Sequence, residues 1–172
     1  DRHSLNTASK YIEEKITKKT KAIFLNHYGG VPCDMDSIIE LAQAHNIILI
    51  EDAACAPRSF YKGKAAGTFG DMGVWSFDAM KILSTGDGAM IYLKDKEILQ
   101  AAKEFLYLGL PAKEKSGFDK AANENNIWWE YEINSFGRRA IMNNIAGAIG
   151  CAQLKKLDQF ICIVLCATPL ML

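Results

Sequence analysis

The sequence predicts an α/β fold in which a mostly parallel sheet is flanked by helices. Two apolar runs, residues 21–28 (KAIFLNHY) and 47–56 (IILIEDAACA), indicate strands, and residues 33–46 between them carry apolar side chains at helical spacing. Strand, helix and strand in this order form a βαβ unit. Because both runs are almost continuously apolar, we expect the two strands to be parallel and buried on both faces.

Two helices accompany this unit. Residues 7–16 place apolar side chains at helical spacing, which predicts a helix before the first strand. The helix at 33–46 has three candidate N-caps, Asp34, Asp36 and Ser37, and the residue pattern leaves the choice among them open.

Two further strands are predicted at residues 73–77 (GVWSF) and 89–93 (AMIYL). A parallel pair needs a crossover connection of a dozen or more residues, so the short link between these strands favours an antiparallel pair. A helix is expected at 95–108, with Asp95 as its N-cap and Gly109 as the residue just after its end.

The last predicted helix covers residues 140–158, and residues 159–172 form an uncharged apolar tail. Residues 110–130, which separate the helix at 95–108 from this last helix, are polar and irregular. Regular structure is expected to resume at 128–133 (WWEYEI). The apolar stripe of the last helix consists of Ile141, Ile145, Ala148, Ile149 and Ala152.

Composition narrows the class of protein. The 172 residues are 49% hydrophobic and 23% charged, which is enough for one sizeable core. Twenty basic and twenty acidic residues cancel, so no overall field attracts nucleic acid or an anionic membrane. The five cysteines are odd in number and form neither a CxxC motif nor a Cys/His cluster. We therefore expect no disulfide framework, no metal site and a cytoplasmic location.

Both ends of the sequence are unusual. It starts at Asp1 without an initiator methionine, and it ends in FICIVLCATPLML, a run too short to cross a bilayer, which takes about 20 residues. We find no signal peptide and expect no membrane partner. We expect this chain to be part of a larger protein. A frameshift, a truncated reading frame or the isolation of a fragment would explain its ends.

Polar residues follow the predicted strands. His27 comes after the first strand, Asp52 after the second and Ser76 after the third, with Lys81 a few residues further on. In an open parallel sheet, ligands bind outside the carboxyl ends of the strands. A lysine, an aspartate and a serine at this edge suit pyridoxal 5′-phosphate (PLP), because the lysine binds the aldehyde and the aspartate pairs with the pyridine nitrogen.

Several motifs in order resemble one known family. IEDAACA, GTFGDMGVWSF, SFDAMKILSTGDGAM and AGAIGCAQLKKLD are similar to segments of the DegT/DnrJ/EryC1/StrS sugar aminotransferases, and HYGGVPCDMDSI resembles a further segment. The resemblance covers residues 1 to about 158. It implies the aspartate-aminotransferase-like large domain of PLP fold type I. It also implies transfer of an amino group from a donor such as glutamate to a keto-sugar, often nucleotide-linked, by a homodimer. Such enzymes act in cell-surface polysaccharide or secondary-metabolite biosynthesis.

The resemblance assigns roles position by position. Lys81 matches the Schiff-base lysine that also acts as general base, Asp52 the partner of the pyridine nitrogen, and Ser76 a phosphate ligand. Ala54 would pack against the cofactor ring. Cys55 stands where the family usually has glutamine or histidine near the ring hydroxyl, and a thiol is a weaker hydrogen-bond donor.

The segment SFGRRAIMNNIAGAIG departs from the family pattern Gly-x-Asn-x-Arg. Arg139 stands at the asparagine position and Ile141 at the arginine position. The family asparagine reaches the phosphate of the neighbouring subunit's cofactor. Arg139 would suit a phosphate or an acidic substrate, since a guanidinium binds both.

The resemblance also implies a division of the chain. Residues 1–158 correspond to the central part of the PLP-binding large domain, and residues 159–172 form an atypical tail. The start of the large domain and the small C-terminal domain are not expected within this sequence.

Other readings of the same residues stay open. Lys81 is also compatible with a solvated loop lysine, Asp52 with a helix cap, Ser76 with a strand-end hydroxyl and Cys55 with a small buried residue. His27 is expected to be a satisfied histidine rather than a catalytic one. A catalytically incompetent α/β fragment or association module remains an alternative function. A nucleotide-binding domain is least favoured, because GTFGDMG lacks GxGxxG and precedes a strand.

Overall fold

The computed structural model describes residues 4–111, 133 and 135–167. The chain divides into two compact units, residues 1–94 with 142–172 and residues 95–141. The order predicted at 128–133 and the irregular segment at 110–130 lie almost entirely outside the described residues. Among the described residues, none of the helices has the length and apolar character needed to cross a membrane.

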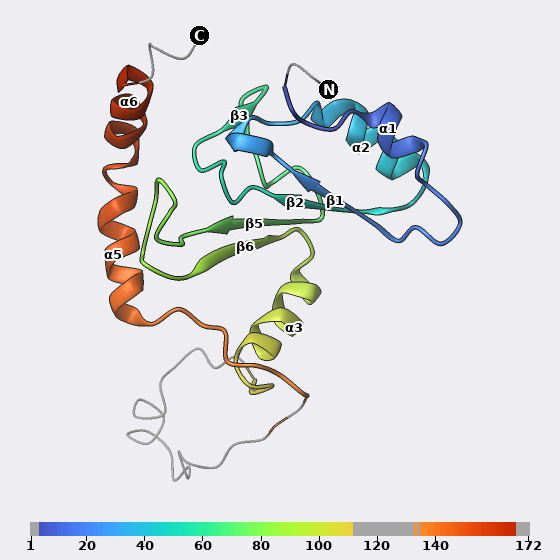
Figure 1. The fold of residues 1–172 in the computed structure, drawn as a ribbon. Coiled ribbons are helices and arrows are strands. Elements are labelled where there is room, and N and C mark those ends of the chain that lie inside the picture. Colours follow the sequence, from blue (N-terminus) through green and yellow to red (C-terminus); the bar gives the residue numbers. More distant parts are fainter. Residues whose placement is uncertain (1–3, 112–132, 134, 168–172) are drawn as a thin grey trace. The chain divides into compact units, whose positions relative to one another are not determined.

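The first unit contains a four-stranded sheet of order β1-β2-β5-β6 (Figure 1). β1 (Ala22–Asn26), β2 (Ile48–Asp52) and β5 (Met72–Ser76) are parallel neighbours. β6 (Ala89–Leu93) pairs with β5 in antiparallel orientation. The predicted fold class, the βαβ unit and the antiparallel pair are therefore confirmed.

The core of the sheet lies on one face of β1 and β2. Ile23 and Leu25 are buried, whereas Phe24 between them is 66% exposed. Ile48 of β2 is likewise 46% exposed. The prediction that both faces are buried is therefore wrong for the described residues. The physical reason is that α1 and α2 supply the apolar side chains that cover one face only.

The helices of this face are α1 (Ser9–Glu13), shorter than the predicted 7–16, and α2 (Met35–Ala44). The face of α2 that carries Met35, Ile38 and Ala42 is buried. A one-turn 3₁₀ helix, η1 (Tyr28–Gly30), follows β1.

Asp34 occupies the N-cap position of α2, but its side chain does not cap the helix. Instead it accepts the hydroxyls of Ser37 at 2.8 Å and Tyr61 at 2.7 Å. Tyr61 belongs to a small antiparallel hairpin of β3 (Phe60–Tyr61) and β4 (Lys64–Ala65). The Tyr61 hydrogen bond therefore ties this hairpin to the start of α2.

The helix predicted at 140–158 is in fact two helices. α5 (Asn144–Leu154) is capped at its start by Asn143, whose side chain accepts the Ala146 N–H at 2.9 Å. α6 (Leu157–Ala167) then continues into the segment predicted as a tail. The predicted apolar stripe is not buried among the described residues, since Ile145 is 76% exposed and Ile149 43% exposed.

The second unit contains α3 (Lys96–Leu106), which confirms the predicted helix with slightly narrower bounds. The Asp95 carboxylate accepts the Glu97 N–H at 2.7 Å and caps its start. Gly109 has a φ of +74° and donates its N–H to the Glu104 carbonyl at 2.8 Å. Because α3 ends at Leu106 with Tyr107 as its C-cap, the position directly after the cap belongs to Leu108, with a φ of +65°, and Gly109 lies one residue beyond the predicted position.

Glu51 is a charged side chain in the interior, with 0% exposure. Its carboxylate accepts the His27 Nε2 hydrogen at 2.9 Å and the backbone N–H groups of Gly67, Phe69 and Gly70 at 2.6–2.7 Å. Burial raises the pKa of this carboxyl, but the hydrogen bonds from His27 and the backbone outweigh burial and hold the pKa below its ordinary value. Glu51 thus fixes the turn that leads into β5.

Glu51→Gln is expected to lower the free energy of unfolding by about 2–4 kcal/mol, because an amide cannot accept all four hydrogen bonds. A lowered folded pKa means that Glu51 adds stability above its unfolded pKa, and this stability is lost as the pH falls through the folded pKa. The variant is therefore expected to lose stability less steeply on acidification. Urea unfolding at a series of pH values measures both effects. Glu40→Gln, on the exposed side of α2, is the matched control, and equal losses in both variants would contradict the assignment.

Candidate active site

Three parallel strands end at one edge of the sheet. Asn26 at the end of β1 pairs in register with Asp52 at the end of β2. Asp52 in turn pairs with Val74 of β5, so Ser76 lies two residues further along that strand. The strand register therefore places Asp52 and Ser76 at the same carboxyl edge of the sheet, as predicted. Open parallel sheets bind ligands at this edge.

The Asp52 carboxylate is held by two hydrogen bonds. Oδ1 accepts the Ala54 N–H at 3.0 Å, and Oδ2 accepts an N–H of the Asn26 side chain at 3.0 Å. Both bonds orient a half-buried carboxylate at the strand end. Sequence reasoning missed Asn26, although a signal was present, since Asn26 ends the first strand just as Asp52 ends the second.

The loop from Phe77 to Gly88 carries Lys81 and is closed at its base. Phe77 donates its N–H to the Gly88 carbonyl, and the Thr85 N–H reaches the Phe77 carbonyl, each at 2.9 Å. Ser76 Oγ accepts the Asp78 N–H at 3.2 Å. The loop therefore begins from the strand end that carries Ser76.

A tight turn within the loop sets the position of Lys81. The Lys81 N–H donates to the Asp78 carbonyl at 3.0 Å, and the Met80 N–H donates to Asp78 Oδ1 at 2.9 Å. Met80 itself is 90% exposed, whereas Lys81 is half-buried. The turn thus directs Met80 to solvent and leaves Lys81 partly covered.

Lys81 and Cys55 are in direct contact. Lys81 Nζ donates a hydrogen bond to Cys55 Sγ at 3.3 Å. The thiol is exposed, so the alternative that Cys55 is a small buried residue is wrong. Because Cys55 follows Asp52 by three residues, this contact brings the amine of Lys81 to the turn that leaves β2.

The turn at residues 53–56 is built from small side chains. Ala53 and Ala56 are buried, and Trp75 of β5 packs against them. The Ala56 N–H donates to the Ala53 carbonyl at 2.8 Å. Gly30, with a φ of +83°, approaches the Cys55 carbonyl so closely that any Cβ there would overlap it. Close packing therefore holds the backbone on which Ala54 and Cys55 sit.

His27 is buried and fully engaged, as predicted. Its Nδ1 accepts the Cys33 N–H at 3.2 Å, and its Nε2 contacts Glu51 at 2.9 Å. Because Nδ1 is an acceptor, the hydrogen of the neutral ring is on Nε2 and points to the carboxylate. His27 is thus a structural residue of the interior rather than a catalytic group.

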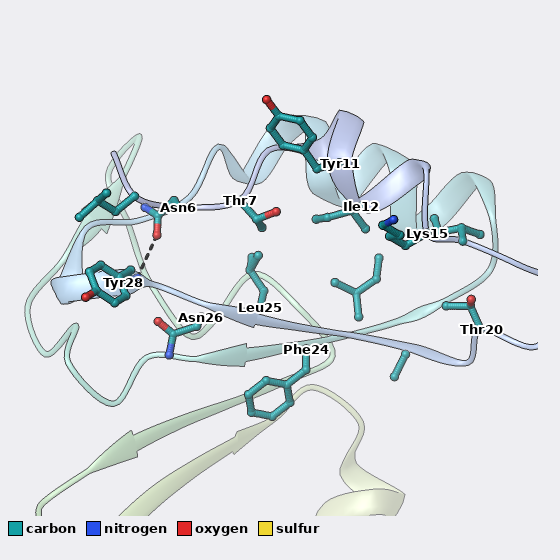
Figure 2. A pocket seen from close by; sticks show the side chains of 14 residues that line it. Asn6, Thr7, Tyr11, Ile12, Lys15, Thr20, Phe24, Leu25, Asn26 and Tyr28 are labelled. Carbon is teal, nitrogen blue, oxygen red and sulfur yellow. Dashed lines mark hydrogen bonds between the residues drawn. The ribbon is translucent and has the colours of Figure 1, made fainter. Parts of the chain in front are cut away.

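A pocket of about 550 Å³ runs along β1 (Figure 2). α1 and residues 5–7 form one wall, and β1 forms the other. The Asn6 side chain accepts the Tyr28 N–H at 2.9 Å at one end of the pocket. Asn26 lines the same pocket, so the pocket adjoins the residue that holds Asp52.

Arg139 belongs to the second unit. There it forms an isolated antiparallel bridge with Tyr107, and its side chain is exposed. Its role toward a phosphate or an acidic substrate stays a prediction. No group of three or more metal-binding side chains occurs within residues 4–111, 133 and 135–167.

The donor set at the sheet edge fits PLP. Lys81 offers an amine, Asp52 an oriented carboxylate and Ser76 a hydroxyl. The half-buried Ala54 follows Asp52 by two residues. These are the groups that an aldehyde, a protonated pyridine nitrogen and a phosphate need. Fold and site together define a PLP-type α/β large domain.

Comparison with known proteins gives the family. Residues 1–162 match the DegT/DnrJ/EryC1/StrS aminotransferase family, and the chain belongs to it. It is 44% identical over 161 residues to dTDP-4-dehydro-2,3,6-trideoxy-D-glucose 4-aminotransferase from Saccharopolyspora spinosa, covering 94% of this chain and 41% of that protein. It is 42% identical over 150 residues to GDP-perosamine synthase from Escherichia coli, covering 87% and 37%. The chain thus spans less than half the length of these relatives.

Solved structures agree with the fold. The aminotransferase TlmJ from Streptoalloteichus hindustanus matches with a TM-score of 0.80 and 42% identity, over 92% of this chain and 40% of that one. The Escherichia coli GDP-4-keto-6-deoxy-D-mannose-3-dehydratase, solved with bound hydrated PLP, matches with a TM-score of 0.74 and 28% identity. That match covers 94% of this chain and 42% of that one. The predicted PLP-fold large domain is therefore confirmed.

Cysteine alkylation tests whether Cys33 is buried and Cys55 is exposed, as the structure describes. Burial, with a further contribution from the Glu51 charge, raises the pKa of the Cys33 thiol to about 11. We therefore expect Cys33 to react with iodoacetamide at least about tenfold more slowly than the exposed Cys55 near neutral pH. Peptide mass spectrometry over time measures both rates, and Cys151 serves as an exposed reference. Equal rates for Cys33 and Cys55 in the folded chain would contradict the described packing.

Proposed function

We propose that residues 1–158 form the central part of the large domain of a PLP-dependent sugar aminotransferase. The enzyme transfers an amino group from an amino acid donor such as glutamate to a keto-sugar, often nucleotide-linked. The observation that carries the proposal is the sheet edge, where Asp52 is oriented by two hydrogen bonds and Lys81 contacts the turn that follows it. Family membership supports the reaction class.

The residues at this edge have complementary roles toward the cofactor. Lys81 would attach PLP through Nζ, and the Ser76 hydroxyl would bind its phosphate. Asp52 would accept a hydrogen bond from the pyridine N–H, with its carboxylate already held by Asn26 and Ala54. Ala54 would pack against the ring, and Cys55 would lie beside Lys81 near the ring hydroxyl.

When bound, PLP supplies an electron sink for the substrate carbon that loses its proton. Lys81 Nζ would take a proton from the donor carbon that loses its nitrogen and deliver a proton to the keto-sugar carbon that gains nitrogen. Arg139 would bind a phosphate or an acidic group of the substrate. The oriented Asp52 would keep the pyridine nitrogen protonated during these proton movements.

The substrate class rests on the relatives. One relative is named for a dTDP-linked keto-sugar and another for GDP-perosamine, which supports a nucleotide-linked keto-sugar for this protein too. Cell-surface polysaccharide or secondary-metabolite biosynthesis in the cytoplasm is the setting that we infer.

A homodimer is part of the proposal. Apolar side chains on the described surface support association with another chain, since Phe24, Ile145 and Leu165 are each at least 66% exposed. The same exposure favours a second candidate function, an association module without catalysis. Addition of glutamate and a dTDP-linked keto-sugar to the PLP-loaded chain separates the two. Formation of 2-oxoglutarate supports the enzyme, and a dimer without turnover supports the module.

Lys81→Ala is expected to abolish covalent PLP attachment, because no other residue named for the cofactor offers an amine. The wild-type chain and the variant are incubated with PLP, reduced with borohydride, digested and mapped by mass spectrometry. The wild type should carry a phosphopyridoxyl group on the peptide that contains Lys81.

Lys94→Ala, which removes an exposed lysine at the end of β6, is the matched control and should label as the wild type does. Labelling of Lys81→Ala to the wild-type extent would show that PLP attaches elsewhere.

A further inference from the structure

The contact between Lys81 and Cys55 joins two nucleophilic side chains. Nζ and Sγ are 3.3 Å apart, the thiol is exposed and the amine is half-buried. The two residues belong to different turns, one after β2 and one after β5. An exposed thiol is the form of cysteine that oxidants reach, and a neighbouring amine can trap the oxidised sulfur.

We propose that Lys81 and Cys55 form a reversible covalent link when a peroxide oxidises the cofactor-free chain. The link is a sulfenamide, a single bond between Sγ and Nζ. It is a modification site that blocks the amine of Lys81. Its consequence for PLP rests on the proposed function, but formation of the link does not.

The chemistry balances in two steps. The Cys55 thiol is oxidised by two electrons to sulfenic acid, while hydrogen peroxide is reduced to water. The lone pair of the uncharged Lys81 amine then attacks the sulfur, the S–O bond breaks, and the leaving hydroxide takes a proton from nitrogen as a second water. The linked chain therefore has two hydrogen atoms fewer than the reduced chain.

Among the hydrogen bonds of the described cysteines, that of Cys55 is the one that reaches a side-chain amine, whereas the exposed Cys151 has no such contact. Cys33 is buried and its thiol donates a hydrogen bond to the Asn26 carbonyl at 3.4 Å, so a peroxide in solvent does not reach it. Cys162 and Cys166 are exposed on α6, with their sulfur atoms 4.0 Å apart, and they would consume oxidant by reacting with each other. Both are therefore replaced by serine in the chain used for the test.

The link would prevent PLP from attaching to Lys81. The same Nζ cannot hold PLP and Sγ at once, so PLP bound to Lys81 protects against the link and the link prevents attachment of PLP. A thiol reductant attacks the sulfur, restores Cys55 and frees the amine. A glutamine or histidine at position 55, as the family usually has, would lack this sensitivity.

The test treats the cofactor-free Cys162→Ser/Cys166→Ser chain with equimolar hydrogen peroxide and digests it with trypsin in the absence of thiols. We expect a cross-linked peptide pair that contains Cys55 and Lys81, two hydrogen atoms lighter than the sum of the reduced peptides. Trypsin should not cleave after the linked Lys81. Dithiothreitol should remove the link and restore cleavage.

Lys81→Arg, which keeps the charge but has no primary amine, is the matched variant and should give Cys55 sulfenic or sulfinic acid without a link. Cys55→Ser should give no modification at this site. Oxidation of Cys55 in the Lys81-containing chain without any link to Lys81 would overturn the proposal, and so would an equal yield of cross-link in Lys81→Arg.

The outcome is separable from that of the proposed function. Borohydride labelling of the reduced chain reports PLP attachment, and peptide mapping of the oxidised chain reports the link. A link in a chain that never binds PLP supports this inference and contradicts the proposed function. Where PLP does bind, loading after oxidation should fall in proportion to the linked fraction and return with dithiothreitol.

Discussion

The buried Glu51 carboxylate is the interaction on which the candidate site depends. It gathers hydrogen bonds from His27, which follows β1, and from the backbone between Gly67 and Gly70, which precedes β5. One side chain of β2 thus connects the two neighbouring strands from the interior. Because side chains alternate along a strand, Asp52 emerges on the other face with its register already set. A buried charge of this kind is tolerated only while its partners are complete, so the turn and the strands are held together as a unit.

The parts of the fold that depend on local patterns could be predicted from the sequence. Strand–helix–strand spacing gave the parallel pair, the short link before residue 89 gave the antiparallel one, and Asp95 and Gly109 marked a helix. The strand-end positions of Asp52 and Ser76 followed from the same patterns. Asn26 was missed although it stands at a strand end, because its pairing with Asp52 depends on strand register. The role of Glu51 could not be assigned from local patterns, because its backbone partners lie in a turn sixteen to nineteen residues away.

The failed expectations share a cause, since each concerned what covers an apolar surface. Apolar runs at β1 and β2 indicated burial on both faces, but only one face meets α1 and α2. The apolar character of residues 140–172 indicated one helix at 140–158 and a tail at 159–172, whereas a break near Lys155 and Lys156 separates two helices with mostly exposed side chains. Hydropathy records a preference for burial and does not identify the covering surface. Cys55 illustrates the same limit, because its exposure and its contact with Lys81 depend on the turn rather than on residue type.

The central claim is that the carboxyl edge of β2 and β5 binds PLP through Lys81. A crystal structure of this chain grown with PLP tests it most directly. We expect continuous electron density from Lys81 Nζ to the cofactor, with the pyridine nitrogen beside the Asp52 carboxylate and the phosphate at Ser76 Oγ. Density for PLP on a different lysine, or an ordered cofactor with its pyridine nitrogen away from Asp52, would contradict the account.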